Sequence, residues 1–153
     1  MDKPTFQFTK EGFAALHEEM RQLRERRPLV LKRMVEAREQ GDLSENAGYH
    51  AAKEELGKID SRISELKFMI RFGVVAESQS ASVAGFGSTV LVSAGGLKKE
   101  FKIVSAQEAD PASGKISDSS PIGKGLIGKK AGEQFIVETP NGKNSFEVLE
   151  IKK

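Results

Sequence analysis

The sequence predicts an α+β protein in which an N-terminal antiparallel coiled-coil hairpin precedes a small antiparallel sheet with one short helix. Three observations support this fold class. Two long stretches carry apolar or long-stemmed side chains at the alternating spacing of three and four residues that is typical of a coiled coil. The positions in the two stretches are mirror images about Leu43. Beyond residue 75 the helical spacing stops, and short β-branched runs alternate with turn signals.

The mirror symmetry predicts that the chain folds back at Leu43, because each of these positions then faces one on the other arm. We call these positions the seam. Each arm of about 30 residues would extend about 45 Å, at about 1.5 Å per residue. The seam comprises Phe13, Leu16, Met20, Leu23, Arg27, Val30, Met34 and Ala37 on the first arm, and Tyr49, Ala52, Leu56, Ile59, Ile63, Leu66 and Ile70 on the second.

The composition agrees with a chain that spends half its length on a thin hairpin, since 38% of the residues are hydrophobic and 30% are charged. The sequence lacks the apolar run of about 18 residues that a membrane helix requires. Its first residues lack the basic and apolar regions of a signal peptide. It has no cysteine, which excludes disulfides and thiolate metal sites. We therefore expect a cytoplasmic protein with no membrane partner.

The first helix is predicted over about 10–40, with Thr9 as its N-cap and Gly41 as its C-terminal stop. Pro28 lies inside this helix, and because the seam continues past it we expect a bend and not a break. The second helix is predicted over about 44–72, where Asp42 and Glu45 have the spacing of a capping box.

The hairpin domain is thus predicted over residues 1–75, with its tip at 41–46, and a second domain over 76–153. A short helix is expected from Ser120-Pro121 to near Gly128. The glycine-rich run at 123–130 matches nucleotide-binding motifs by its letters only, because the required strand–loop–helix context is missing. The predicted strands lie at 89–93, 98–105, 134–139 and 145–151, the last two joined by a turn at 140–143.

The tip carries two carboxylates, Asp42 and Glu45, and two interpretations of them stay open. Both could simply cap the second helix. Alternatively they form part of a Mg²⁺ site, since hard cations prefer carboxylate oxygens. Mg²⁺ takes about six oxygen ligands, so two side chains on an exposed turn cannot hold it tightly alone. In that interpretation another molecule must supply the remaining ligands.

A basic cluster on the first arm, with Glu25 as its only acid, also allows two interpretations. Charged runs on helices are usually solvated faces. The functional interpretation is contact with the phosphates of a single nucleic-acid strand, without base stacking because no aromatic row accompanies the charges. The cluster comprises Arg21, Arg24, Arg26, Arg27, Lys32 and Arg33.

Two segments closely resemble the signatures of the GreA/GreB family of bacterial transcript cleavage factors. The first is the tip, from Gly41-Asp42-Leu43-Ser44-Glu45-Asn46 to Glu54, and the second runs from Ser119 to Gly128. The resemblance covers nearly the whole chain. Gly48 departs from the acidic residue expected there, which loosens the first turn of the second helix but leaves both carboxylates in place.

This resemblance implies a factor that binds backtracked RNA polymerase, whose RNA 3′ end is extruded, and acts as a monomer. The C-terminal domain would resemble FK506-binding proteins and dock at the rim of the secondary channel, while the hairpin enters it. Asp42 and Glu45 would hold Mg²⁺ only jointly with the polymerase, which itself cleaves the RNA, so the factor is not an enzyme alone. The tip would be supported by Gly41, Leu43, Ser44, Asn46 and Tyr49, and docking would involve Ser120, Pro121, Ile122, Gly125, Leu126, Ile127 and Gly128.

Two alternative functions remain at this point. The same scaffold could be an inhibitor whose tip only blocks the polymerase channel, although the intact carboxylate pair argues against that. It could instead be a prolyl isomerase or chaperone module on a helical stalk. That function requires an aromatic-lined pocket, and the C-terminal half offers only Phe86, Phe101, Phe135 and Phe146, most of which are expected in the core.

Overall fold

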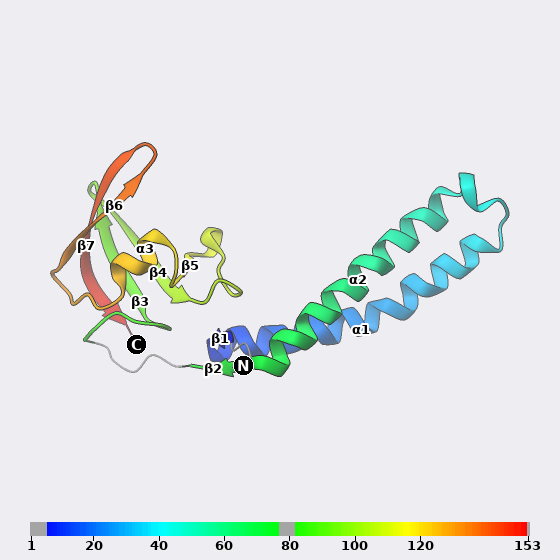
Figure 1. Ribbon diagram of the computed structural model, residues 1–153, viewed down its shortest axis with the longest axis horizontal. Coiled ribbons are helices and arrows are strands. Elements are labelled where there is room, and N and C mark those ends of the chain that lie inside the picture. Colours follow the sequence, from blue (N-terminus) through cyan, green and yellow to red (C-terminus); the bar gives the residue numbers. More distant parts are fainter. Residues whose placement is uncertain (1–5, 77–81, 153) are drawn as a thin grey trace, which may run out of the picture. The chain divides into compact units, whose positions relative to one another are not determined.

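The computed structural model describes residues 6–76 and 82–152, apart from the side chain of Leu43 (Figure 1). The chain divides into two compact units, one formed by Phe13–Phe72 and the other by Met1–Gly12 together with Gly73–Lys153. We call them the hairpin unit and the globular unit. Residues 77–81 of the predicted loop before the first sheet strand lie outside the described residues.

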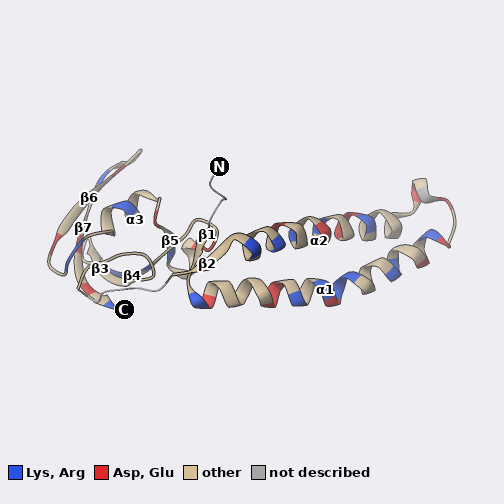
Figure 2. Ribbon diagram, turned by 60° about the horizontal axis from the view of Figure 1, so that its bottom comes forward, with Lys and Arg blue, Asp and Glu red and all other residues tan. Residues whose placement is uncertain are grey.

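The hairpin unit is built from α1 (Lys10–Arg38) and α2 (Ala47–Phe72), with a one-turn 3₁₀ helix, η1 (Leu43–Glu45), between them. The two helices lie side by side in both overall views (Figures 1 and 2). As predicted, α1 continues through Pro28 without a break. No helix among the described residues is both long enough and apolar enough to cross a bilayer.

The predicted seam is confirmed at its apolar positions, since all of them are buried or half-buried. The Arg27 side chain is 41% exposed. Burying one apolar stripe between two amphipathic helices is the main source of stability in such a hairpin. Arg27 is the one charged seam residue, and its Nε lies 2.6 Å from Oδ1 of Asp60 on α2. The fully or largely buried seam residues are Leu16, Met20 and Val30 on α1, and Ala52, Ile59, Ile63 and Leu66 on α2.

Gly57 lies on the exposed side of α2, where an added methyl group would meet no atom within 4 Å. Replacing it with alanine removes the entropic cost of glycine in a helix interior, so Gly57→Ala should stabilise the hairpin by up to about 1 kcal/mol. Urea unfolding followed by circular dichroism at 222 nm should show a higher midpoint with an unchanged slope. A lower midpoint would mean that α2 is not a regular helix at this position.

A short parallel pair, β1 (Phe6–Phe8) with β2 (Gly73–Val75), was not predicted. Thr9 is the predicted N-cap of α1, since its Oγ1 accepts a hydrogen bond from the Gly12 N–H at 3.0 Å. The Thr9 hydroxyl and N–H both donate to the Glu108 carboxylate, at 2.6 and 2.9 Å. Glu108 therefore anchors the first turn of α1 within the globular unit.

The globular unit contains a five-stranded sheet in the order β5-β4-β3-β7-β6. Neighbours pair antiparallel except β4 and β5, which are parallel, so the sheet is mixed where the sequence predicted an antiparallel one. The difference arises because β5 has only three residues and follows β4 through a crossover with a 3₁₀ turn, η2 (Pro111–Ser113). The strands are β3 (Thr89–Ala94), β4 (Leu97–Val104), β5 (Lys115–Ser117), β6 (Gln134–Thr139) and β7 (Gly142–Lys152).

The predicted short helix is α3 (Pro121–Leu126), and Ser120 caps it by accepting a hydrogen bond from Gly123 N–H at 3.0 Å. The predicted turn between β6 and β7 is also present, at Pro140–Asn141. One face of the sheet and α3 enclose the core of the unit. This core comprises Ala84, Val90, Val92, Ile103, Ile116, Leu126, Phe135, Val137, Phe146, Val148 and Ile151.

Candidate functional site

The tip of the hairpin begins where α1 ends at Arg38 and reverses through Gly41, whose φ of +135° favours glycine. The chain then makes the single 3₁₀ turn η1 and enters α2 at Ala47. Asp42 and Glu45 are both exposed on this turn. The site is therefore an open acidic turn at the end of a two-helix arm.

Asp42 is held in place by Ser44. The Ser44 N–H and hydroxyl both donate to Oδ1 of Asp42, at 3.0 and 2.8 Å. These two bonds, the backbone one first, hold the pKa of Asp42 below its usual value, so the carboxylate is ionised at neutral pH. Its second oxygen accepts no hydrogen bond within the described residues, and it is free to bind a cation.

The Glu45 carboxylate makes no hydrogen bond or ion pair with any described residue, although its backbone belongs to the 3₁₀ turn η1. The described residues also contain no group of three or more His, Cys, Asp or Glu side chains that could hold a metal. Two ionised oxygen donors fit the ligand chemistry of Mg²⁺, but they leave most of its coordination shell unfilled. The tip can thus complete a metal site but not form one alone.

The predicted capping box is wrong, because Asn46 and not the acidic pair caps α2. The Asn46 Oδ1 accepts from the Tyr49 N–H at 3.0 Å, and its Nδ2 donates to the Ala37 carbonyl at 2.6 Å. One amide thus satisfies a free N–H at the start of α2 and adds a second hydrogen bond to the Ala37 carbonyl at the end of α1, which also accepts from the Gln40 N–H at 3.1 Å. Because the 3₁₀ turn takes up residues 43–45, α2 starts three residues later than predicted.

Replacing Asn46 should therefore loosen the tip. Asn46→Ala removes both bonds and should destabilise the hairpin by about 1–2 kcal/mol. Asn46→Asp keeps the oxygen that caps α2. It replaces the donor Nδ2 with a carboxylate oxygen, so the hydrogen bond to the Ala37 carbonyl is lost. Hydrogen exchange should then speed up at the Tyr49 amide in the alanine variant and less so in the aspartate variant. Ser61→Ala, a substitution at an exposed position of α2, is the control. It should leave the stability of the hairpin and the exchange rate of the Tyr49 amide unchanged.

The other residues expected to support the tip behave differently from one another. Tyr49 is half-buried, and the Lys53 ammonium lies 6.0 Å from its ring centroid. The side chain of Leu43 lies outside the described part of the structure, so a contact between it and a partner stays a prediction. At Gly48 an added methyl would meet only ordinary contacts, 3.5 Å from Asn46 Oδ1, so the backbone there does not require glycine.

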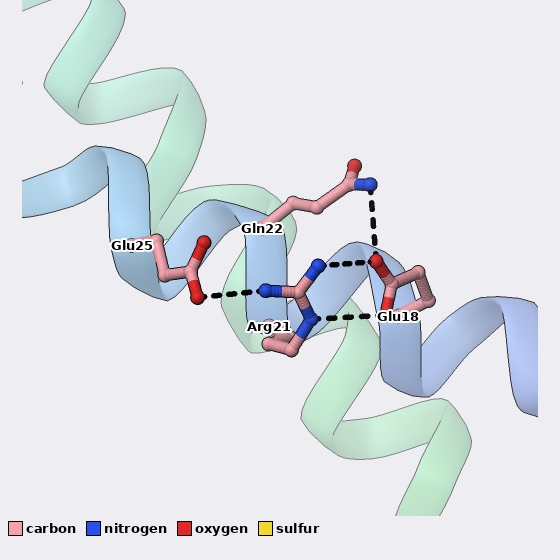
Figure 3. A network of polar contacts seen from close by, with 4 residues as sticks. All are labelled: Glu18, Arg21, Gln22 and Glu25. Atoms are coloured by element: carbon pink, nitrogen blue, oxygen red, sulfur yellow. Dashed lines mark hydrogen bonds and ion pairs between the residues drawn. The ribbon is translucent and has the colours of Figure 1, made fainter.

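Most of the predicted basic cluster is neutralised by nearby acids. Arg21 binds Glu18 and Glu25 on its own helix, and Gln22 also donates to Glu18 (Figure 3). These bonds, with Glu18 the largest contributor, raise the pKa of Arg21 above its usual value. Five of the six cluster residues have such a carboxylate partner, and within the described residues Arg24 is the exception. These ion pairs could not be predicted from the charges along α1 alone, because some of the partner carboxylates lie on α2.

Within the described residues, three of the four ion pairs that join α1 to α2 line one flank of the hairpin, which we call the paired flank, and the fourth, Arg27 with Asp60, lies on the other side of the seam. Glu55 binds both Arg26 and Arg33, and Glu19 binds Arg62 at 2.7 Å. Blue and red segments accordingly alternate along the helices in Figure 2. By heptad position these residues follow one side of the seam: Glu19, Arg26 and Arg33 on α1, and Glu55 and Arg62 on α2.

The other side of the seam is the cationic flank, which sequence reasoning missed. Seven of the twelve Lys and Arg side chains within residues 13–72 form ion pairs with carboxylates. The other five lack such a partner in the described structure, and they share this flank. Assigning heptad positions on both arms, and not only counting charges along one, would have revealed them. They are Arg24 and Arg38 on α1, and Lys53, Lys67 and Arg71 on α2.

The second signature mainly serves the fold of the globular unit. Leu126 is fully buried, Ile122 packs against the core, and a methyl group on Gly125 would lie 2.4 Å from the Phe135 ring. The Ser120 side chain caps α3 and therefore serves the fold. The residues of the predicted docking set that are exposed are Pro121, Ile127 and Gly128.

Fold and tip together define a coiled-coil hairpin protein with exposed acidic residues at the turn and a separate mixed-sheet unit. Residues 6–75 match the family described as "Transcription elongation factor, N-terminal", and residues 79–153 match "Transcription elongation factor, GreA/GreB, C-term". The chain belongs to the GreA/GreB family of transcription elongation factors.

Individual relatives agree with this assignment. Transcription elongation factor GreA of Syntrophobacter fumaroxidans is 45% identical over 97% of this chain and 99% of its own. Transcription elongation factor GreA of Bacillus cytotoxicus is 40% identical over 97% of both chains. Among solved structures, GreA factor homolog 1 of Thermus thermophilus is 33% identical, over 98% of this chain and 100% of that one, with a TM-score of 0.46.

Proposed function

We propose that this elongation factor enters the secondary channel of backtracked RNA polymerase and stimulates the polymerase's own cleavage of the RNA 3′ end. The observation that carries the proposal is a pair of exposed carboxylates, Asp42 and Glu45, at the end of a long, thin arm. The 29 residues of α1 extend about 43 Å at about 1.5 Å per residue. An arm of this length suits delivery of the two carboxylates into a catalytic centre that lies deep within a partner.

Asp42 and Glu45 are the residues that would hold Mg²⁺ jointly with the polymerase. When bound there, Mg²⁺ would lower the pKa of a bound water and neutralise charge on the scissile phosphate. Ser44 fixes Asp42 through one oxygen, which leaves the other oxygen available to a ligand or to the attacking water. Glu45 has no competing partner within the described residues and is free to take either role. In this scheme the factor completes an active site and is not an enzyme alone.

Arg38 and Lys53 are the cations of the cationic flank that lie closest along the chain to the acidic turn. Neither has a carboxylate partner in the described structure, so both are available to phosphates. We assign them to the extruded RNA strand, whereas Arg24, the unpaired member of the predicted basic cluster, lies about 21 Å along α1 from Arg38 and is not part of this assignment. The ion-paired members of that cluster would have to exchange their carboxylates for phosphates, which is feasible because exposed ion pairs contribute little to stability.

The globular unit is then the part that docks on RNA polymerase, through the exposed members of its signature and in monomeric form, in the bacterial cytoplasm. A prolyl isomerase site is disfavoured, because Phe135 and Phe146 stack on each other in the core with ring centroids 5.2 Å apart. An inhibitor that merely blocks the channel would have no need for the Ser44 bonds that hold Asp42.

The test is an assembled RNA polymerase complex stalled in a backtracked position with end-labelled RNA. Adding the protein with Mg²⁺ should shorten the RNA from its 3′ end and restore elongation, and neither should occur without polymerase. Slower intrinsic cleavage in the presence of the protein would favour the inhibitor and reject the proposal.

A further inference from the structure

The base of the hairpin unit contains a hollow that the proposed function does not use. It has a volume of about 280 Å³ and lies between the two helices, lined by His17, Met20, Arg24, Lys67, Ile70 and Arg71. Arg24 precedes Arg38 by 14 residues of helix, or about 21 Å at about 1.5 Å per residue. The hollow is therefore well separated from the acidic tip.

The hollow gathers positive charge that the protein does not neutralise. Arg24, Lys67 and Arg71 all line it, and none forms an ion pair with a carboxylate in the described structure. Elsewhere in the same hairpin seven cations do find carboxylates. Like charges placed opposite each other on two helices are destabilising. An anion bound between these cations would offset their mutual repulsion.

The lining of the hollow favours a compact anion. Met20 is only 6% exposed and Ile70 is half-buried, so part of the lining of the hollow is apolar. Arginine guanidinium groups bind phosphate oxygens in pairs, and lysine adds a point charge.

We propose that this hollow binds the diphosphate group of a nucleotide. Three cationic residues line one small hollow, and that suits two adjacent phosphates better than the single, widely spaced phosphates of an RNA strand. The volume is near the lower limit for ligand pockets, so it fits a diphosphate and leaves the nucleoside outside. The binding does not depend on the cleavage activity proposed above.

The experiment is calorimetric titration of the full-length protein with pyrophosphate, in a low-salt buffer free of sulfate and phosphate. We expect saturable binding to one site. Arg24→Gln combined with Lys67→Gln should weaken it by about tenfold or more. Lys58→Gln is the matched control, because that exposed lysine already pairs with Glu54, and it should stay within about twofold of the wild type. Circular dichroism should show equal helix content in all three proteins.

Further titrations distinguish the sources of phosphate. A nucleoside diphosphate should bind like pyrophosphate and lose affinity in the same double variant. The proposal is overturned if pyrophosphate binding is absent, if the double variant binds as well as the wild type, or if orthophosphate binds equally tightly. It is also overturned if a single-stranded RNA lacking terminal phosphates displaces pyrophosphate from the hollow, since that would make the site part of an RNA track. Because free protein is titrated, failure here leaves the cleavage proposal untouched.

Discussion

The double variant Asp42→Asn, Glu45→Gln should bind RNA polymerase normally but lose stimulated RNA cleavage by about 100-fold or more. Both changes keep the shape of the side chain while removing its charge. The asparagine oxygen at position 42 can still accept the two Ser44 hydrogen bonds, so the turn should keep its conformation. Cleavage is measured as the rate of RNA shortening in a stalled complex, and binding as competition with labelled wild-type protein.

The control for this pair is Glu39→Gln, which removes another exposed carboxylate near the tip but outside the turn η1. It should retain wild-type cleavage. Equal losses in the control and the double variant would point to general electrostatic effects of the acidic tip. Full cleavage by the double variant would reject a role for the carboxylates in holding Mg²⁺.

The single variants should separate the two roles. Asp42 is preorganised by Ser44, whereas Glu45 has no partner within the described residues. If Asp42 holds the cation, extra Mg²⁺ should partly rescue Asp42→Asn. If Glu45 mainly orients water, Glu45→Gln should respond less to added Mg²⁺. Equal rescue of both would assign both to the metal.

The hairpin could be predicted almost completely from the sequence because its seam follows a strict periodicity. Every apolar seam position predicted from Phe13 to Ile70 is buried or half-buried in the structure. The tip was harder, because capping is decided by which side chain reaches the free backbone groups. Both Asp42 and Asn46 are good cap residues, and only the conformation of η1 selects Asn46.

Features that depend on distant parts of the chain could not be predicted. The basic cluster seemed unpaired along α1, yet Glu55 and Asp60 on α2 neutralise part of it. The three-residue strands β1, β2 and β5 are too short to show a periodicity, so their parallel pairings were missed. The glycines of α3 resembled a phosphate-binding loop, and only packing shows why glycine is needed there.

Gly123→Ala should be among the most destabilising single substitutions in the globular unit. Its Cβ would lie 2.0 Å from the Ser117 carbonyl oxygen, a backbone atom that cannot rotate away. That same oxygen accepts hydrogen bonds from the Ser120 N–H at 3.0 Å and hydroxyl at 2.6 Å, which hold the start of α3 against β5. Relieving the clash must separate these elements, so we expect a loss of about 3 kcal/mol or more.

Gly85→Ala is the matched control, because Gly85 belongs to the same unit, has no atom within 4 Å of an added methyl, and does not have a positive φ. The stability of the globular unit in Gly85→Ala should remain close to that of the wild type. Hydrogen exchange over residues 89–152 would report the globular unit, while amides of α2 would report the hairpin. Gly123→Ala should accelerate exchange in the first region only. If it instead leaves the globular unit as stable as Gly85→Ala does, then Gly123 is not needed for packing, and a ligand role for the glycine-rich run would have to be reconsidered.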